Sequence, residues 1–169
     1  MADLDFAQIL DTVARATHGF RSDYTPKDPM ANLLFVNRPR AYETVSDIVR
    51  RELGVEIAST DFGAMETVGR LATAIAMTLD PDQAVPQIVQ TVIRVNTQNP
   101  AQVMPLDAEL TRDRMRPERT MSPDGRLSAI FACEEYFGLE GQDPSVASIR
   151  TGDNLVAYIR EGLLANAGR

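Results

Sequence analysis

The sequence has very few of the residues that build metal centres and covalent cross-links. Its 169 residues include one cysteine, Cys133, and one histidine, His18. A single cysteine cannot form a disulfide within the chain, and these two side chains are too few for a zinc site. We therefore expect neither a disulfide framework nor a structural metal.

Tryptophan is absent, and aromatic residues make up only 6% of the chain. Apolar residues make up 44% and charged residues 24%, as in an ordinary globular protein. Because so few of the apolar residues are aromatic, we expect helices that pack through aliphatic side chains.

Basic residues are scarce relative to acidic ones, 17 against 24, which gives a formal net charge of −7. Affinity for nucleic acid rests on many Lys and Arg side chains that neutralise phosphates, so nucleic-acid binding is not expected. An acidic surface suits a basic protein partner better.

Long hydrophobic runs are also missing, so the sequence predicts no membrane span. The first residues, MADLDF, lack the basic segment and apolar run of a signal peptide. We therefore expect a cytoplasmic protein.

What the sequence does contain is an internal repeat. QILDTVARA at 8–16 recurs as QIVQTVIRV at 87–95, and we call this alignment the first register. ELGVEI at 52–57 aligns with YFGLEG at 136–141, and we call this alignment the second register. Two segments that recur in the same order at similar spacing indicate a duplication.

The duplication predicts a first domain over residues 1–80 and a second over 81–169. Aligned residues lie five positions further apart in the second register than in the first. The second half therefore contains an insertion, which we assign to the Arg-rich stretch 111–120. This stretch either binds an anion or an acidic partner, or is a solvated loop whose charges compensate one another.

Apolar residues recur at helical spacing three times in each half. The predicted helices cover residues 4–17, 40–53, 66–79, 84–97, 124–138 and 152–165. Short helices fit near 59–63 and 144–148. The apolar stripes predict core positions that include Leu53, Ile75, Leu79, Cys133, Phe131, Phe137 and Ile159.

The expected helix ends carry residues typical of caps. Side chains that can accept hydrogen bonds from the first turn of a helix are Thr67, Asp80, Ser122 and Thr151. Gly54 and Gly138 stand where the second helix of each half should end. We therefore predict an all-α protein of two four-helix bundles packed together.

The order of these elements resembles the acyl carrier protein family. ACEEYFGLEGQDPSVASIRTGDNLVAYIREGL at 132–164 is similar to the second, third and fourth helices of a carrier protein. RRELGVEIASTDFGAMETVGRLATAIA at 50–76 fits the same pattern. The resemblance implies two tandem carrier-like bundles.

Carriers of that family bear a 4'-phosphopantetheine arm on the serine of an Asp-Ser-Leu sequence at the start of the second helix. By the resemblance, this position falls on Pro39 in the first half and on Pro123 in the second, and neither half has Asp-Ser-Leu. The nearest hydroxyl belongs to Ser122. It either carries the arm at a helix N-terminus, where phosphate is favoured, or is the N-cap of a helix that begins at Pro123.

The same resemblance implies that Glu134, Glu135 and Glu140 form part of an acidic face that meets basic partner proteins. We therefore expect a non-enzymatic binding or regulatory module without a cofactor, which docks on an enzyme of acyl, lipid or secondary-metabolite synthesis. The alternative is a working acyl or peptidyl carrier with phosphopantetheine on Ser122.

The residues of the chain do not suggest an active site. Cys133 lies on an apolar helical stripe, as expected of a small buried hydrophobe. His18 follows the first helix, where a C-terminal cap is its expected role. No second histidine is available for a triad, and no glycine-rich phosphate loop is present.

Overall fold

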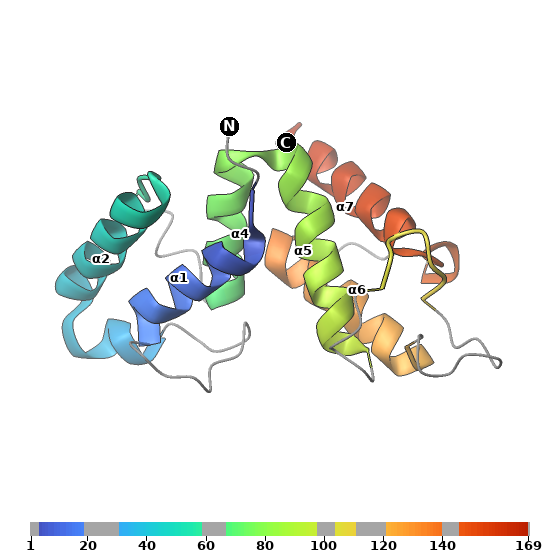
Figure 1. The fold of residues 1–169 in the computed structure, drawn as a ribbon, viewed down its shortest axis with the longest axis horizontal. Helices are drawn as coiled ribbons and strands as arrows, with labels where there is room; N and C mark the ends of the chain where they lie inside the picture. The colour runs from blue at the N-terminus through green and yellow to red at the C-terminus, as the bar shows by residue number, and fades with distance from the viewer. Residues whose placement is uncertain are drawn as a thin grey trace. The chain divides into compact units, whose positions relative to one another are not determined.

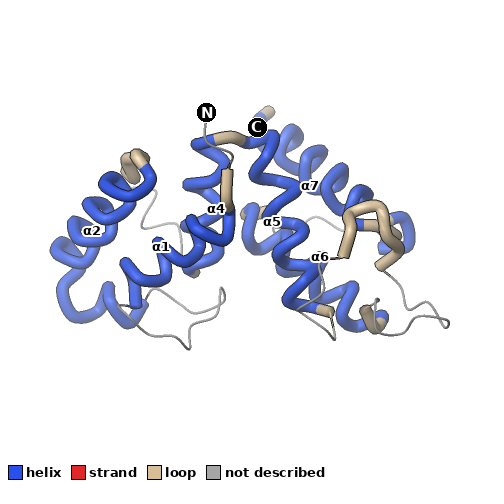
Figure 2. The backbone as a smooth tube through the Cα atoms, in the orientation of Figure 1, coloured by secondary structure: helices blue, strands red, loops and turns tan. Residues whose placement is uncertain are grey.

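The computed structural model describes residues 4–18, 31–58, 67–97, 104–110, 121–139 and 146–168. In these ranges the chain is helical and contains no β-strand, which confirms the all-α prediction (Figures 1 and 2). The chain divides into two compact units, Met1–Ala84 and Val85–Arg169. The boundary therefore lies slightly beyond the expected one, inside a helix that begins at Pro81.

Unit 1 contains α1 (Phe6–His18), α2 (Ala31–Leu53) and α4 (Val68–Leu79). Helix α1 contacts both α2 and α4, so it forms the centre of the unit (Figure 1). The buried side chains come from one stripe of each helix and include Phe6, Ile9, Leu10, Val13, Val45, Val49, Leu71 and Ile75. These stripes confirm the helical periodicity of the first half.

Unit 2 contains most of α5 (Pro81–Asn96), then α6 (Pro123–Phe137), the 3-10 helix η2 (Val146–Ser148) and α7 (Gly152–Ala167). Helix α6 contacts α7. Buried side chains include Ile88, Val89, Val92, Ile130, Cys133, Leu155 and Ile159. Helix η2 agrees with the short helix expected near 144–148, whereas the one expected near 59–63 lies outside the described residues.

Helix α2 begins at Ala31, well before the expected start near residue 40. The prediction relied on Pro39, because proline lacks an N–H donor and favours the first turn. The structure instead places Pro39 inside the helix, which contains the apolar sequence ANLLFV before it. A helix can continue through an interior proline by forming a kink. The expected start of this helix near residue 40 was therefore wrong.

The expected caps are confirmed in both units. Thr67 Oγ1 accepts a hydrogen bond from Arg70 N at 3.2 Å, and Thr151 Oγ1 accepts one from Asn154 N at 3.2 Å. Asp80 Oδ1 accepts hydrogen bonds from the first turn of α5. Gly54 and Gly138 follow the last residues of α2 and α6 with φ values of +71° and +65°, which glycine adopts without a steric cost.

The duplication extends to the pattern of burial. In the first register, buried positions of α1 fall on buried positions of α5: Phe6/Val85, Ile9/Ile88, Leu10/Val89, Val13/Val92 and Ala14/Ile93. In the second register the same holds for Val45/Ala129, Val49/Cys133, Leu71/Leu155, Ala72/Val156 and Ile75/Ile159. The two units therefore bury equivalent faces of equivalent helices.

Two of the expected core residues are exposed. Leu79, the last residue of α4, is 42% exposed, and Phe131 on α6 is 53% exposed. Leu53 and Phe137 are half-buried. Phe131 was misplaced because Ile130 and Cys133, which are fully buried, point to a different side of the same helix.

A short segment before α6 covers the start of α7. Leu106 O accepts a hydrogen bond from Asp153 N at 2.8 Å, and Leu110 N donates one to Arg150 O at 2.7 Å. The backbones approach so closely that a Cβ on Gly152 would lie 2.8 Å from Leu106 Cδ2 and 2.9 Å from Leu106 O. Only glycine fits at this position without a shift of the segment.

We predict that Ile75→Ala and Ile159→Ala each lower the free energy of unfolding by about 2–5 kcal/mol, because each removes a buried side chain and leaves a cavity. Leu79→Ala is the matched control, since Leu79 is 42% exposed whereas Ile75 and Ile159 are buried. Urea denaturation measures all three. An equal loss for Leu79→Ala would contradict the assignment of the buried faces.

Gly152→Ala should destabilise unit 2 by about 1–3 kcal/mol, because the added methyl overpacks the contact with Leu106. Gly168→Ala is the control, since an added Cβ there meets no atom closer than 3.9 Å. Hydrogen exchange of the Asp153 amide should also become faster in Gly152→Ala. Unchanged exchange and stability would show that the two backbones are not in contact.

Candidate functional site

Ser122 is the N-cap of α6. Its backbone is extended, with φ −63° and ψ 160°, and Pro123 is the first residue of the helix. The Oγ atom accepts a hydrogen bond from Gly125 N at 3.0 Å. The capping role predicted from the sequence is confirmed, and the hydroxyl oxygen is held against the first turn of α6.

The residues around Ser122 fix this arrangement from both sides. Met121 is fully buried, and its N–H donates to Leu110 O at 3.1 Å. A Cβ on Gly125 would lie 3.2 Å from Asn96 O, so the first turn of α6 packs closely against the end of α5. Ser122 therefore lies at a structured and well-packed helix start.

Unit 1 lacks the equivalent of this helix start. In the second register, Ser122 aligns with Arg38. Arg38 and Pro39 both lie within α2, which begins at Ala31. The first half therefore has neither a serine nor a helix N-terminus at the position where the family resemblance places the arm.

The three glutamates expected on one acidic face have different surroundings. Glu134 is only 6% exposed, and its Oε1 accepts a hydrogen bond from the Tyr158 hydroxyl of α7 at 2.5 Å. Glu135 is half-buried, and Glu140 lies outside the described residues. Glu134 therefore joins α6 to α7 inside unit 2, which corrects the expectation that it lies on a docking face.

Cys133 is completely buried on α6. Burial, reinforced by the nearby charge of Glu134, raises the pKa of the Cys133 thiol far above its usual range. The thiol is thus protonated at neutral pH and is a packing group rather than a nucleophile. Burial likewise raises the pKa of Tyr136.

His18 is the last residue of α1, at the helix end where the sequence places it. The Arg-rich stretch 111–120 lies outside the described residues. Within the described ranges, no group of three His, Cys, Asp or Glu side chains is arranged to hold a metal ion.

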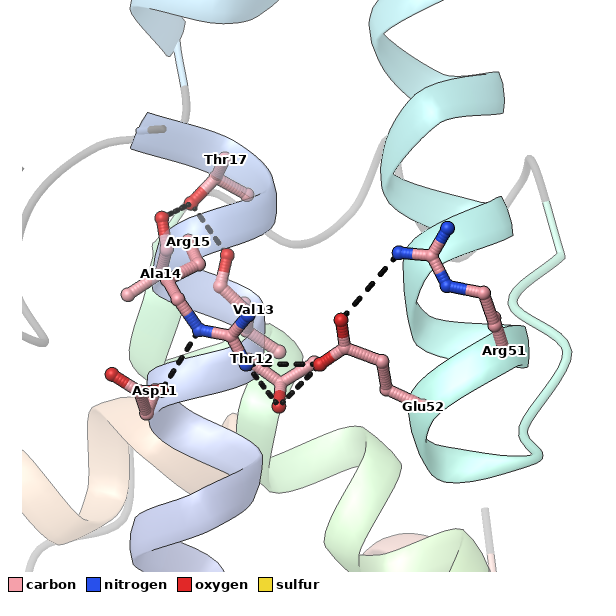
Figure 3. A network of polar contacts seen from close by, with 8 residues as sticks. All are labelled: Asp11, Thr12, Val13, Ala14, Arg15, Thr17, Arg51 and Glu52. Atoms are coloured by element: carbon pink, nitrogen blue, oxygen red, sulfur yellow. Dashed lines mark hydrogen bonds and ion pairs between the residues drawn. The ribbon is translucent and has the colours of Figure 1, made fainter. Parts of the chain in front are cut away.

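A polar network joins α1 to the end of α2 (Figure 3). Arg15 forms ion pairs with Asp11 and with Glu52, each at 2.9 Å. The buried Thr12 hydroxyl donates to Glu52 at 3.4 Å, and Arg51 lies 3.6 Å from the same carboxylate. The hydrogen bond from Arg15 lowers the pKa of Glu52 below its usual value.

The equivalent positions of unit 2 do not carry the same set of side chains. Thr91 and Arg94 of α5 occupy the positions equivalent to Thr12 and Arg15, but the buried Tyr136 stands where unit 1 has Glu52. The charged members of the network pair with one another at the surface, and together with the buried Thr12 they link α1 to α2.

Glu52→Gln should reduce stability at neutral pH and have less effect in acid. The lowered pKa means that the carboxylate stabilises the folded state above its unfolded pKa of about 4.3, and that this contribution is lost as the pH falls through the folded value. Urea midpoints at pH 7 and pH 3 measure the difference. Glu43→Gln, on the exposed side of α2, is the control, and equal losses for both variants would contradict the assignment.

One surface feature was missed by the sequence analysis. At helical spacing along one side of α6 lie Asp124, Leu127, Ser128, Phe131 and Glu135, which we call the α6 stripe. Asp124, Ser128 and Phe131 are exposed, whereas Leu127 and Glu135 are half-buried. The repeat indicates that the position of Phe131 is exposed, because Phe131 aligns with Asp47, a residue with an exposed side chain.

Comparison with known proteins finds no match among family models, curated proteins or solved structures. Among the described residues, no helix is long and apolar enough to span a membrane.

Proposed function

We propose that this chain is a non-enzymatic, carrier-protein-like binding or regulatory module that docks on a partner protein and bears no phosphopantetheine arm. The observation that carries the proposal is the N-cap hydrogen bond, in which Ser122 Oγ accepts from Gly125 N. On the family resemblance, we expect this partner to be a protein of acyl, lipid or secondary-metabolite synthesis.

The geometry at Ser122 argues against a carrier. Attachment of an arm requires a serine oxygen that can attack an activated phosphate, but here that oxygen is engaged with the first turn of α6. Turning it outward would give up a cap worth about 1 kcal/mol. Pro123, at the position that the resemblance assigns to the arm, has no hydroxyl.

The buried polar groups of unit 2 argue against an enzyme. The Cys133 thiol is protonated and inaccessible. The Glu134 carboxylate is engaged by the Tyr158 hydroxyl. Each of these two groups has a structural role, so neither is free to act on a substrate.

The intact mass of the chain after coexpression with a broad-specificity phosphopantetheinyl transferase tests the proposal. We expect no added mass, while an established carrier protein in the same cells gains the arm. An increase by one phosphopantetheine that disappears in Ser122→Ala would overturn the proposal and establish the alternative, a working carrier modified on Ser122.

Ser122→Ala should also lower the free energy of unfolding by about 0.5–2 kcal/mol, because it removes the cap of α6. Ser128→Ala is the matched control, since Ser128 is exposed inside the same helix. Urea denaturation distinguishes the two variants. Equal stability of Ser122→Ala and the unsubstituted chain would contradict the capping role.

A further inference from the structure

The α6 stripe places an apolar pair between two carboxylates. Leu127 and Phe131 are one helical turn apart, so their side chains are neighbours on the surface of α6. Phe131 is 53% exposed. Asp124 precedes the pair and Glu135 follows it. An apolar centre with a polar rim is the arrangement found in protein interfaces.

Unit 1 provides an internal control for this surface. In the second register, Leu127 aligns with Glu43 and Phe131 with Asp47. Both of these residues are exposed on α2, and Asp47 forms an ion pair with Arg50 at 3.0 Å. The same position in a repeated unit therefore accepts an acidic side chain, so the aromatic ring of Phe131 is not required for packing.

The carboxylates at the two ends of the α6 stripe favour a binding partner with basic side chains. Because a helix rises about 1.5 Å per residue, Asp124 and Glu135 are separated by about 16 Å along the axis of α6. A complementary helix has an apolar anchor between basic residues spaced about three turns apart. A symmetric antiparallel pairing of two α6 stripes would instead bring Asp124 of one copy beside Glu135 of the other, which like-charge repulsion disfavours.

We propose that the α6 stripe of unit 2 docks a basic amphipathic helix of a partner protein, with Phe131 as the apolar anchor. The proposal rests on the proposed function as a binding module, and it assigns the docking to unit 2 alone. At the equivalent position of Glu135, unit 1 carries Arg51, so its surface has the opposite charge there.

The test uses the full chain and a helical peptide probe of about five turns that has leucines on one face and lysines at both ends. The control peptide has the same sequence with glutamates in place of the lysines. Fluorescence anisotropy measures the affinity of each, and backbone amide shifts identify the surface used. We expect the lysine peptide to bind at least ten times more tightly and to shift the amides of the α6 stripe.

The repeat supplies matched variants. Phe131→Asp installs the residue that unit 1 carries at this position, and it should weaken binding of the lysine peptide at least tenfold without lowering the melting temperature. The reciprocal variant, Asp47→Phe, should leave the affinity unchanged. Unchanged binding by Phe131→Asp, or shifts confined to unit 1, would overturn the proposal.

A charge reversal keeps the proposal testable if Phe131→Asp fails to fold. The double variant Asp124→Lys with Glu135→Lys should bind the glutamate peptide in preference to the lysine peptide. An unaltered preference would overturn the proposed role of the two carboxylates.

The peptide-binding results and the mass measurement test different proposals. An arm on Ser122 would refute the proposed function. If Ser122 is unmodified and Phe131→Asp does not weaken binding of the lysine peptide, this docking site alone is refuted.

Discussion

The last helix of each unit begins the same number of residues after a glycine with positive φ, and the side chains that this helix buries depend on where it begins. Thr67 follows Gly54 at the same spacing at which Thr151 follows Gly138. Each threonine caps the helix that follows it. The spacing fixes which side chains of α4 and α7 are buried, so Leu71 and Leu155 both become completely buried. A change in register at either cap would expose these residues.

The two units keep this buried framework but differ in the polar contacts around it. In unit 1, Glu52 pairs with Arg15 and joins α2 to α1. In unit 2, Tyr136 replaces that glutamate, and Glu134 joins α6 to α7 through Tyr158. Duplicated units of this kind can diverge at the surface because exposed substitutions usually change stability little. The surfaces of α2 and α6 therefore differ, and the proposed docking surface lies on α6 alone.

Most of the helices could be predicted because their apolar stripes and caps agree. Phe6, Ile9 and Val13 recur at helical spacing and are buried, and Thr67 and Thr151 cap the helices that they were expected to cap. The start of α2 could not be predicted from Pro39, because local propensity does not decide whether a proline begins a helix or lies within it. The burial of Glu134 depends on Tyr158, which is distant in the sequence and belongs to another helix.

Phe131 illustrates the same limit at the proposed docking surface. Apolar residues occur on every side of α6, including Leu127, Ile130 and Cys133, so periodicity alone does not identify its buried face. The packing of α6 separates Ile130, which is buried, from Phe131, which is exposed. The alignment with Asp47 contains this information, because the equivalent position of a repeated unit is expected to share its burial.

Ser122 caps α6, and we propose that it does not carry an arm. The most direct test is the mass of the proteolytic peptide that contains Ser122, taken from the protein purified from the cells that naturally make it. We predict that this mass equals the mass calculated from the sequence of the peptide. A species heavier by one phosphopantetheine, with the added mass mapped to Ser122, would contradict it.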